Sequence, residues 1–166
     1  SDFAHRDIVA GSFVPGADPH DGHGHGTHVT GTACGPRQAQ EGPGYGLASE
    51  ASIYAGKVLS DEGSGTDSGI LAGIQWAISN GCSVVSMSLG APAQPGQPYS
   101  RAFEQVARRA MARGTLIIAA AGNESQRSAG VIAPVGHPAN CPSIMAVGAV
   151  GPELQIADFS SGTVDE

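Results

Sequence analysis

Basic residues, aromatic residues and long apolar runs are all scarce in this sequence. There are 8 Lys and Arg against 15 Asp and Glu, which leaves a formal charge of −7, and no segment is basic. This charge repels a nucleic-acid backbone, so nucleic acid is not an expected partner. No apolar run approaches the roughly 20 residues of a membrane-spanning helix, and the chain does not begin with a signal-peptide pattern. The sequence therefore predicts neither nucleic-acid binding nor membrane insertion.

Cysteine is also rare, with three residues at unrelated spacings, Cys34, Cys82 and Cys141. Three cysteines allow at most one disulfide within the chain, and they equally allow three reduced thiols, which is the alternative favoured here. The 25 Gly and 11 Pro residues fall between apolar segments and do not form one tract. A chain of 166 residues with this pattern is expected to form one globular domain with many turns.

The apolar residues form segments that alternate between strand-like and helix-like patterns. Runs of β-branched and small apolar residues predict strands at residues 52–59, 82–89, 115–121 and 143–150. Apolar residues at helical spacing predict helices at residues 66–80 and 99–114. This alternation is typical of an α/β fold with a parallel sheet flanked by helices. The last two strands lack alternating polar residues, so we expect them to be buried on both faces.

The densest chemical signal is a segment rich in Gly and His, Asp-Gly-His-Gly-His-Gly-Thr-His-Val-Thr-Gly-Thr, at residues 21–32. In it, His25 and His28 lie about one helical turn apart at the expected start of a helix. Histidine titrates near neutral pH, so a fixed imidazole beside a hydroxyl can act as the general base of acyl transfer. Two alternatives stay open from the residues alone. The histidines at 20, 23, 25 and 28 could bind a metal ion, or they could belong to a solvated loop.

Two other segments place small or polar residues at the ends of predicted strands. Ala-Ala-Ala-Gly-Asn-Glu occupies residues 119–124, where Asn123 could present an amide donor. A Gly-Asn pair by itself is more often an ordinary turn. Ser-Met-Ser-Leu-Gly at residues 86–90 is again a strand that runs into glycine, which alone indicates only a strand end.

In this order and spacing, the segments resemble the motifs of the subtilisin-like serine proteases, the subtilases. Residues 25–32 are similar to the family's histidine motif, and residues 119–124 to the motif of its oxyanion asparagine. Residues 57–65 and 86–90 resemble its two substrate-binding segments, and residues 142–149 with 159–161 resemble the strand and turn that follow. The resemblance covers essentially the whole chain. It implies that residues 1–166 are the central part of a single subtilase catalytic domain, a three-layer α/β fold truncated at both ends.

The resemblance also implies roles for single residues. His25 would be the general base, and Asn123 would donate to the oxyanion of the attacked carbonyl. Residues implied in substrate binding are Gly63, Ser64, Gly65, Ser88, Leu89, Gly90, Ala120, Ala121, Gly122, Glu124 and Gly136. Gly63–Gly65 and Ser88–Gly90 would pair with an extended polypeptide as added strands. Ala120–Gly122 with Gly136 would line the pocket for the P1 side chain. Glu124 at the rim of that pocket would favour a basic P1 residue.

The family's triad runs Asp, His, Ser along the chain. No Asp before His25 is followed by Thr-Gly or Ser-Gly, and no Gly-Thr pair is followed by Ser. Ser1-Asp2-Phe3 resembles the end of a segment that follows the triad Asp. We therefore expect the triad Asp just before residue 1 and the nucleophilic Ser after residue 166. The 166-residue chain alone is then expected to be inactive.

Cofactors, partners and location follow from the same resemblance. The chemistry would need no cofactor. Asp2 would be a possible ligand of a structural Ca²⁺, although the loop at residues 34–46 lacks the family's Asn-rich ligand run. A polypeptide substrate, and a propeptide or protein inhibitor, are the implied partners, and secretion is the implied location. Other functions stay open: an inactive peptide-binding module or a peptide ligase or macrocyclase on the same fold, and metal-dependent hydrolysis.

Overall fold

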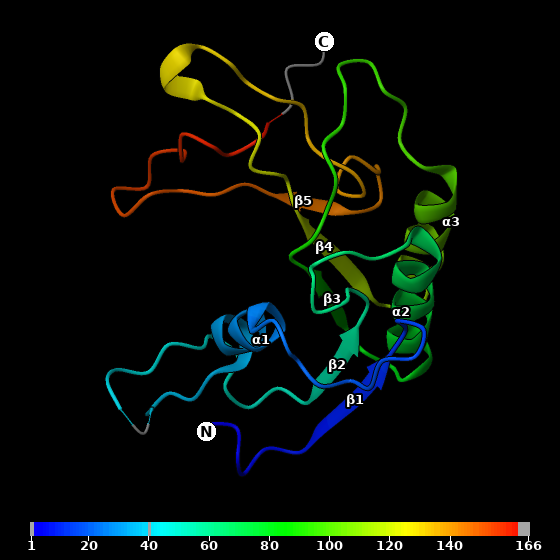
Figure 1. Cartoon of the computed structure of the whole chain (residues 1–166), viewed down its shortest axis with the longest axis vertical. Coiled ribbons are helices and arrows are strands. Elements are labelled where there is room, and N and C mark those ends of the chain that lie inside the picture. Colours follow the sequence, from blue (N-terminus) through cyan, green and yellow to red (C-terminus); the bar gives the residue numbers. More distant parts are fainter. Residues whose placement is uncertain (1, 40, 163–166) are drawn as a thin grey trace. The chain divides into compact units, whose positions relative to one another are not determined.

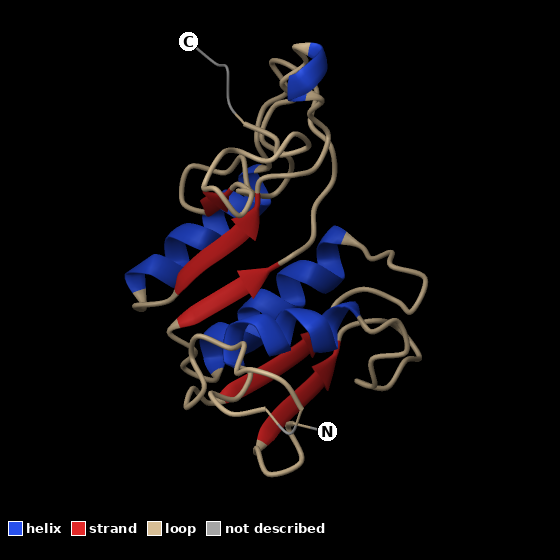
Figure 2. Cartoon of the chain, turned by 90° about the vertical axis from the view of Figure 1, so that its left-hand side faces the viewer, coloured by secondary structure: helices blue, strands red, loops and turns tan. Residues whose placement is uncertain are grey.

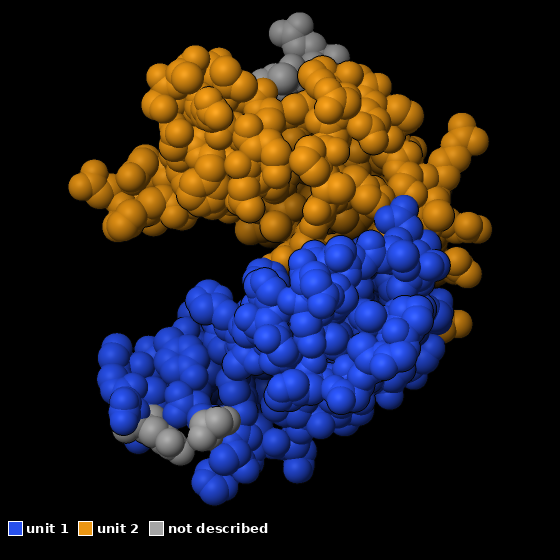
Figure 3. Space-filling view, viewed as in Figure 1, with its two compact units in different colours: residues 1–80 blue, residues 81–166 orange. Residues whose placement is uncertain are grey.

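Strands and helices alternate along the chain, as Figures 1 and 2 show. The computed structural model describes residues 2–39 and 41–162 and divides into two units, residues 1–80 and 81–166 (Figure 3). The first unit contains β1 (Ile8–Ser12), α1 (His25–Cys34), β2 (Ile53–Lys57) and α2 (Asp67–Ser79). The second contains β3 (Val84–Met87), α3 (Arg101–Ala112), β4 (Leu116–Ala120), the 3₁₀ helix η1 (Arg127–Ala129) and β5 (Met145–Val147).

In the first unit, β1 and β2 form a parallel pair, and both α1 and α2 contact β2. The Trp76 indole of α2 lies against Gly11 and Gly56, where the absence of side chains leaves room for the ring. The same indole contacts the rings of Phe13 and Tyr54, with centroids 5.7 and 5.8 Å away. This packing fixes β2 and α2 to each other, so the loop at residues 58–66 that joins them starts and ends on anchored elements.

In the second unit, β3, β4 and β5 form a parallel sheet with β4 in the centre. Helix α3 covers one face of β4, and the core between them includes Phe103, Ala107 and Ile117, each 1% exposed or less. Because the three strands are parallel, the segments that follow them leave the sheet at the same edge, where α/β proteins bind ligands.

The expectation that the last two strands are buried on both faces is wrong. In β4, Ile117 is 1% exposed but its neighbour Leu116 is 39% exposed, and in β5 Met145 and Val147 are 52% and 50% exposed. Helix α3 lies on one face of the sheet, and successive side chains of a strand point to opposite faces. In β4, alternate residues therefore point away from α3 and remain accessible, and in β5 all three residues are exposed.

The predicted helices and strands are otherwise confirmed to within a few residues at each end. Strand β1 was not predicted, since Ile-Val-Ala-Gly-Ser is short and lies beside a glycine-rich stretch. The three cysteines are free thiols, as favoured from the sequence. None of the helices in the described ranges has the length and hydropathy needed to cross a bilayer. The single-domain organisation stays a prediction, because the two units are described separately.

Candidate active site

His25 is the first residue of helix α1, and its side chain is exposed. The preceding residue, Gly24, has φ of 93°, a left-handed conformation that L side chains rarely adopt. The ring of His23 meets that of His25 edge to face, with centroids 6.3 Å apart. The chain thus turns sharply into the helix and presents an imidazole to solvent at its first position.

The carboxylate of Asp21 holds the backbone on both sides of His25. It accepts hydrogen bonds from the backbone N–H of His23 at 3.2 Å and of Gly24 at 2.8 Å, before the histidine. It also accepts from the backbone N–H of Thr27 at 2.7 Å and from the Thr27 hydroxyl at 2.6 Å, after the histidine. The Thr27 hydroxyl first, and then these N–H groups, hold the pKa of Asp21 well below its usual range. Asp21 therefore acts as a side-chain cap of the first turn of α1.

Replacing Asp21 by alanine is expected to lower the free energy of unfolding by about 1 kcal/mol at pH 7, the size typical of a lost helix cap. Because folding lowers the pKa of Asp21, its stabilisation is fully present above the carboxyl's unfolded pKa of about 4. It is lost as the pH falls below that value, toward the lower pKa of the folded state. Urea unfolding of the wild-type and Asp21→Ala proteins at pH 7 and pH 3 checks this.

A matched control for that measurement is Asp18→Ala. Within the described residues, the Asp18 carboxylate accepts the nearby N–H of His20 at 2.8 Å and caps no helix. We expect this control to change the unfolding free energy by a few tenths of a kcal/mol. A cost for Asp21→Ala that is equal at pH 7 and pH 3 would contradict the assignment of Asp21 as an ionised cap.

Gly63, Ser64 and Gly65 lie in the exposed loop between β2 and α2. This loop is closed by two backbone hydrogen bonds, in which the N–H of Ser60 donates to the carbonyl of Ser64 at 2.7 Å and that of Gly63 to the carbonyl of Ser60 at 3.0 Å. The side chain of Thr66 then accepts from the N–H of Gly69 and starts α2. The loop is thus ordered by its own backbone and exposes the segment expected to pair with a substrate.

In the second unit, the segments that follow β3 and β4 meet a third segment at residues 136–137. Ala91 and His137 exchange two backbone hydrogen bonds of 2.8 and 2.9 Å, and the N–H of Gly136 donates to the carbonyl of Ala121 at 2.8 Å. A Cβ on Gly136 would lie 2.8 Å from the carbonyl oxygen of Ala91, so this position accepts only glycine without a shift. The structure therefore brings together the residues near 90, 121 and 136 that were expected to line one pocket.

Asn123 stands three residues after the end of β4, and its side chain is exposed. The backbone before it is held by the N–H of Ser161, which donates to the carbonyl of Gly122 at 3.0 Å. Its own N–H donates to Oε2 of Glu124 at 2.8 Å. The Asn123 carboxamide makes no side-chain hydrogen bond to other residues in the described ranges, so its N–H donors are available to a ligand.

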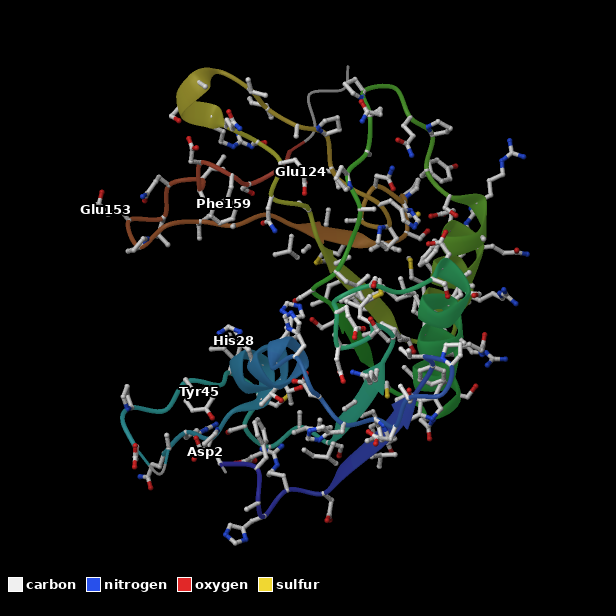
Figure 4. All side chains as sticks on the ribbon, in the orientation of Figure 1. Asp2, His28, Tyr45, Glu124, Glu153 and Phe159 are labelled. Atoms are coloured by element: carbon white, nitrogen blue, oxygen red, sulfur yellow. The ribbon has the colours of Figure 1, made fainter. Side chains whose placement is uncertain are left out.

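Glu124 lies beside Asn123 and is linked to Ser161. The Ser161 hydroxyl donates to Oε2 of Glu124 at 3.0 Å, and the N–H of Glu124 donates to Oγ of Ser161 at 3.2 Å. Figure 4 labels Glu124 and also Phe159, whose carbonyl accepts the N–H of Ser125 at 3.1 Å. The exposed carboxylate is thus held in place by one serine and one backbone amide.

Asp2 and Tyr45 line an open groove of about 470 Å³ beside α1, together with His28 (Figure 4). The phenol of Tyr45 donates to Oδ2 of Asp2 at 2.8 Å. No cluster of three or more His, Cys, Asp and Glu that could hold a metal occurs among residues 2–39 and 41–162. Ca²⁺ takes six to eight oxygen ligands, and one carboxylate beside a phenol and an imidazole does not supply them. A Ca²⁺ bound at Asp2 would therefore need further oxygen ligands from outside these side chains.

The residues predicted from the sequence fall in both units. His25 and Gly63–Gly65 belong to the first unit, and Asn123, Glu124 and the expected pocket residues to the second. The convergence of His25 and Asn123 on one cleft therefore stays a prediction. Ser1 belongs to the Ser-Asp-Phe segment that resembles the end of the family segment after the triad Asp, and it lies outside the described residues.

Sequence reasoning missed the roles of Asp21 and Ser161. Asp21 lies three residues before the N-cap Gly24, outside the position where a capping side chain is normally sought, so its role became visible only with the fold. Ser161 had no local signal either, because its partner Glu124 is 37 residues away. The sequence Asp-Ser-Gly at residues 67–69, which has the form of the family's Asp motif, is the first turn of α2 and follows His25 in the chain.

Comparison with known proteins gives consistent matches. A family model described as "Subtilase family" matches residues 4–166. Subtilisin E of Bacillus subtilis (strain 168) is 46% identical over 165 residues, which is 96% of this chain and 41% of that protein. Subtilisin Savinase of Lederbergia lenta is 40% identical over 150 residues, 90% of this chain and 51% of that protein. The chain therefore spans about half the length of these relatives or less.

The fold comparison agrees with the sequence comparison. The structure of Sphericase matches with a TM-score of 0.79 and 31% identity, over 96% of this chain and 54% of that one. The α/β architecture with parallel strands and flanking helices is thus the subtilisin-like one expected from the motifs. The matched family model, the two relatives and the shared fold lead to one conclusion: the chain belongs to the subtilase family.

Proposed function

We propose that the full-length protein that contains this chain is a serine endopeptidase of the subtilisin type, which hydrolyses internal peptide bonds through an acyl-enzyme. His25 takes the proton of the attacking serine hydroxyl and returns it to the leaving amine. Asn123 donates to the oxyanion that forms on the attacked carbonyl. The observation that carries this proposal is the family match over residues 4–166, which includes His25 at the start of α1 and Asn123 just after β4.

The substrate is an extended polypeptide in this proposal. Gly63–Gly65 and Ser88–Gly90 pair with its backbone as added strands, a mode that uses main-chain hydrogen bonds and tolerates many side chains. The order of the loop at residues 60–65 supports this, because its backbone is held while its outer edge is exposed. The P1 side chain enters between Ser88–Gly90 and Ala120–Gly122, beside Gly136.

The experiment that tests this function is labelling of the full-length protein with a serine-directed phosphonate, followed by mass analysis of its products on a peptide. We expect one labelled serine, hydrolysis of internal bonds and turnover that continues in a chelator while the protein stays folded. Joined or cyclised products would identify a ligase instead, and peptide binding without cleavage would identify an inactive binding module. The 166-residue chain alone is the control. It carries no Gly-Thr-Ser, and we expect neither label nor turnover from it.

Glu124 is proposed to select for a basic P1 residue, because its carboxylate is exposed and held by Ser161 beside the proposed pocket. Replacing Glu124 by glutamine removes the charge and keeps an oxygen that can accept from Ser161. We expect the ratio of kcat/KM for Lys over Phe at P1 to fall about fivefold, the effect of roughly 1 kcal/mol for one exposed ion pair. Assays of paired P1-Lys and P1-Phe peptides give this ratio, and an unchanged ratio would rule out the role.

Catalysis in this proposal rests on imidazole, hydroxyl and amide groups and calls for no cofactor. A structural Ca²⁺ at Asp2, a propeptide or protein inhibitor as partner, and secretion stay predictions from the family resemblance. Each can be checked on the full-length protein, by calcium titration, by the mass of the mature N-terminus and by its presence in the culture medium.

A further inference from the structure

One carboxylate links the loop before His25 to the loop expected to bind the substrate. Asp61 lies in the loop after β2, and its Oδ1 accepts a hydrogen bond from the backbone N–H of Gly22 at 3.1 Å. The same oxygen accepts from Nζ of Lys57, the last residue of β2, at 2.5 Å. Gly22 is three residues before His25, and Asp61 is two residues before Gly63. All of these residues belong to the first unit.

The contact differs from an ordinary surface ion pair in the burial of its lysine. The Lys57 side chain is only 11% exposed, so its ammonium group is confined next to the carboxylate, which is 51% exposed. The hydrogen bond from Lys57 lowers the pKa of Asp61 against the effect of desolvation, and the Gly22 N–H and the charge of Lys57 act in the same direction as that hydrogen bond. The carboxylate is therefore ionised at neutral pH and bridges a fixed cation and a backbone amide.

The fit at Gly22 shows that the two loops are in direct contact there. A Cβ built on Gly22 would lie 2.6 Å from Cγ of Asp61 and would also overlap its Oδ2. The left-handed region is not used at Gly22, so alanine could adopt its backbone conformation and would only push the carboxylate away. The small residue at position 22 is thus matched to the carboxylate at position 61, 39 residues later in the chain.

We propose that Asp61 is a positioning residue, which aligns the loop of the general base with the substrate-binding loop at residues 63–65. Asp21 fixes the backbone around His25 to helix α1, and Asp61 fixes Gly22, in the same turn, to the end of β2. The two carboxylates together leave the segment at residues 21–24 few ways to move relative to the loop at residues 60–65. This inference rests on the proposed function, because it assigns both loops to one peptidase cleft.

The test uses three variants of the full-length protein, with rates expressed per active site titrated by the phosphonate, so that unfolded protein is not counted. Asp61→Ala removes the bridge, and Gly22→Ala displaces it from the other side. A catalytic group misplaced by about 1 Å can cost up to 10²-fold, so for partial loosening we expect each variant to lower kcat about tenfold. The double variant is expected to lose no more than either single one, because both remove one contact.

Asp18→Ala is the matched control, since it makes the same substitution at another carboxylate of the first unit, one that accepts the N–H of His20 at 2.8 Å. It is expected to keep kcat within twofold of the wild type. Hydrogen exchange of the Gly22 amide should be faster in Asp61→Ala than in the wild type and unchanged in Asp18→Ala. An active wild type whose kcat survives Asp61→Ala, or single losses that multiply in the double variant, would overturn the inference. A wild type without peptidase activity would instead overturn the proposed function.

Discussion

Replacing His25 by alanine in the full-length protein is expected to lower kcat for peptide hydrolysis by about 10⁶-fold. This is the size of the loss measured when the triad histidine of a subtilisin is removed. The physical reason is that a serine hydroxyl is a weak nucleophile until a base takes its proton. Hydrolysis of a chromogenic peptide, followed at saturating substrate, measures the change.

The position of His25 makes this variant informative about chemistry and not about folding. Its side chain is exposed at the first position of α1, and alanine has the highest helix propensity. The backbone around it is held by Asp21 through the N–H groups of His23, Gly24 and Thr27. The variant should therefore keep the circular dichroism spectrum and the unfolding midpoint of the wild type while its turnover is lost.

His28→Ala is the matched control for the histidine prediction. His28 lies three residues further along the same helix, is also exposed, and lines the groove of Asp2 and Tyr45. It has no place in the proposed proton transfer, so its replacement is expected to change kcat less than tenfold. Equal losses in the two variants would mean that the helix as a whole, and not the imidazole of His25, accounts for the effect.

Several elements of the fold could be predicted because their signals are local. Helix α2 follows Thr66, whose side chain caps it, and ends before Gly81, as the apolar spacing indicates. Strands β3 and β4 lie within their predicted apolar runs, and His25 begins the predicted helix. Each of these features depends on residues within about four positions of one another, which is the range that propensity and capping rules describe.

The features that could not be predicted depend on residues far apart in the chain. The bridge from Asp61 to Gly22 and the bond from Ser161 to Glu124 join segments 39 and 37 residues apart, and no periodicity records such a pairing. The exposure of Leu116 has the same origin, because burial of a strand depends on what packs against each face. Sequence motifs thus predicted the candidate reacting groups, and the contacts between distant segments around them became visible only with the fold.

The contacts that hold a catalytic residue matter for catalysis in the proposed enzyme. An oxyanion donor is effective only if it is already oriented when charge develops, since reorientation during the reaction costs free energy. In the second unit, the backbone next to Asn123 is held by the bond from Ser161 to Gly122 and by its own bond to Glu124. The motif supplies the amide, and these two contacts hold the backbone that carries it.

Replacing Asn123 by alanine is therefore expected to lower kcat by about 10²- to 10³-fold and to change KM little. The size is the one measured for the loss of a single oxyanion donor in a subtilisin. KM is spared because the carboxamide meets charge only in the transition state, so ground-state binding loses nothing. Measuring kcat and KM separately on one extended peptide tests both parts.

Gln126→Ala is the control for the asparagine prediction, because it removes another exposed amide three residues along the same loop. The backbone of Gln126, and not its side chain, makes the local contacts, with its N–H donating to the carbonyl of Val131 at 2.9 Å. This control should keep kcat. A higher KM with an unchanged kcat in Asn123→Ala would mean that the amide binds the ground state and the transition state equally. Asn123 would then be a substrate-binding residue with no part in stabilising the oxyanion.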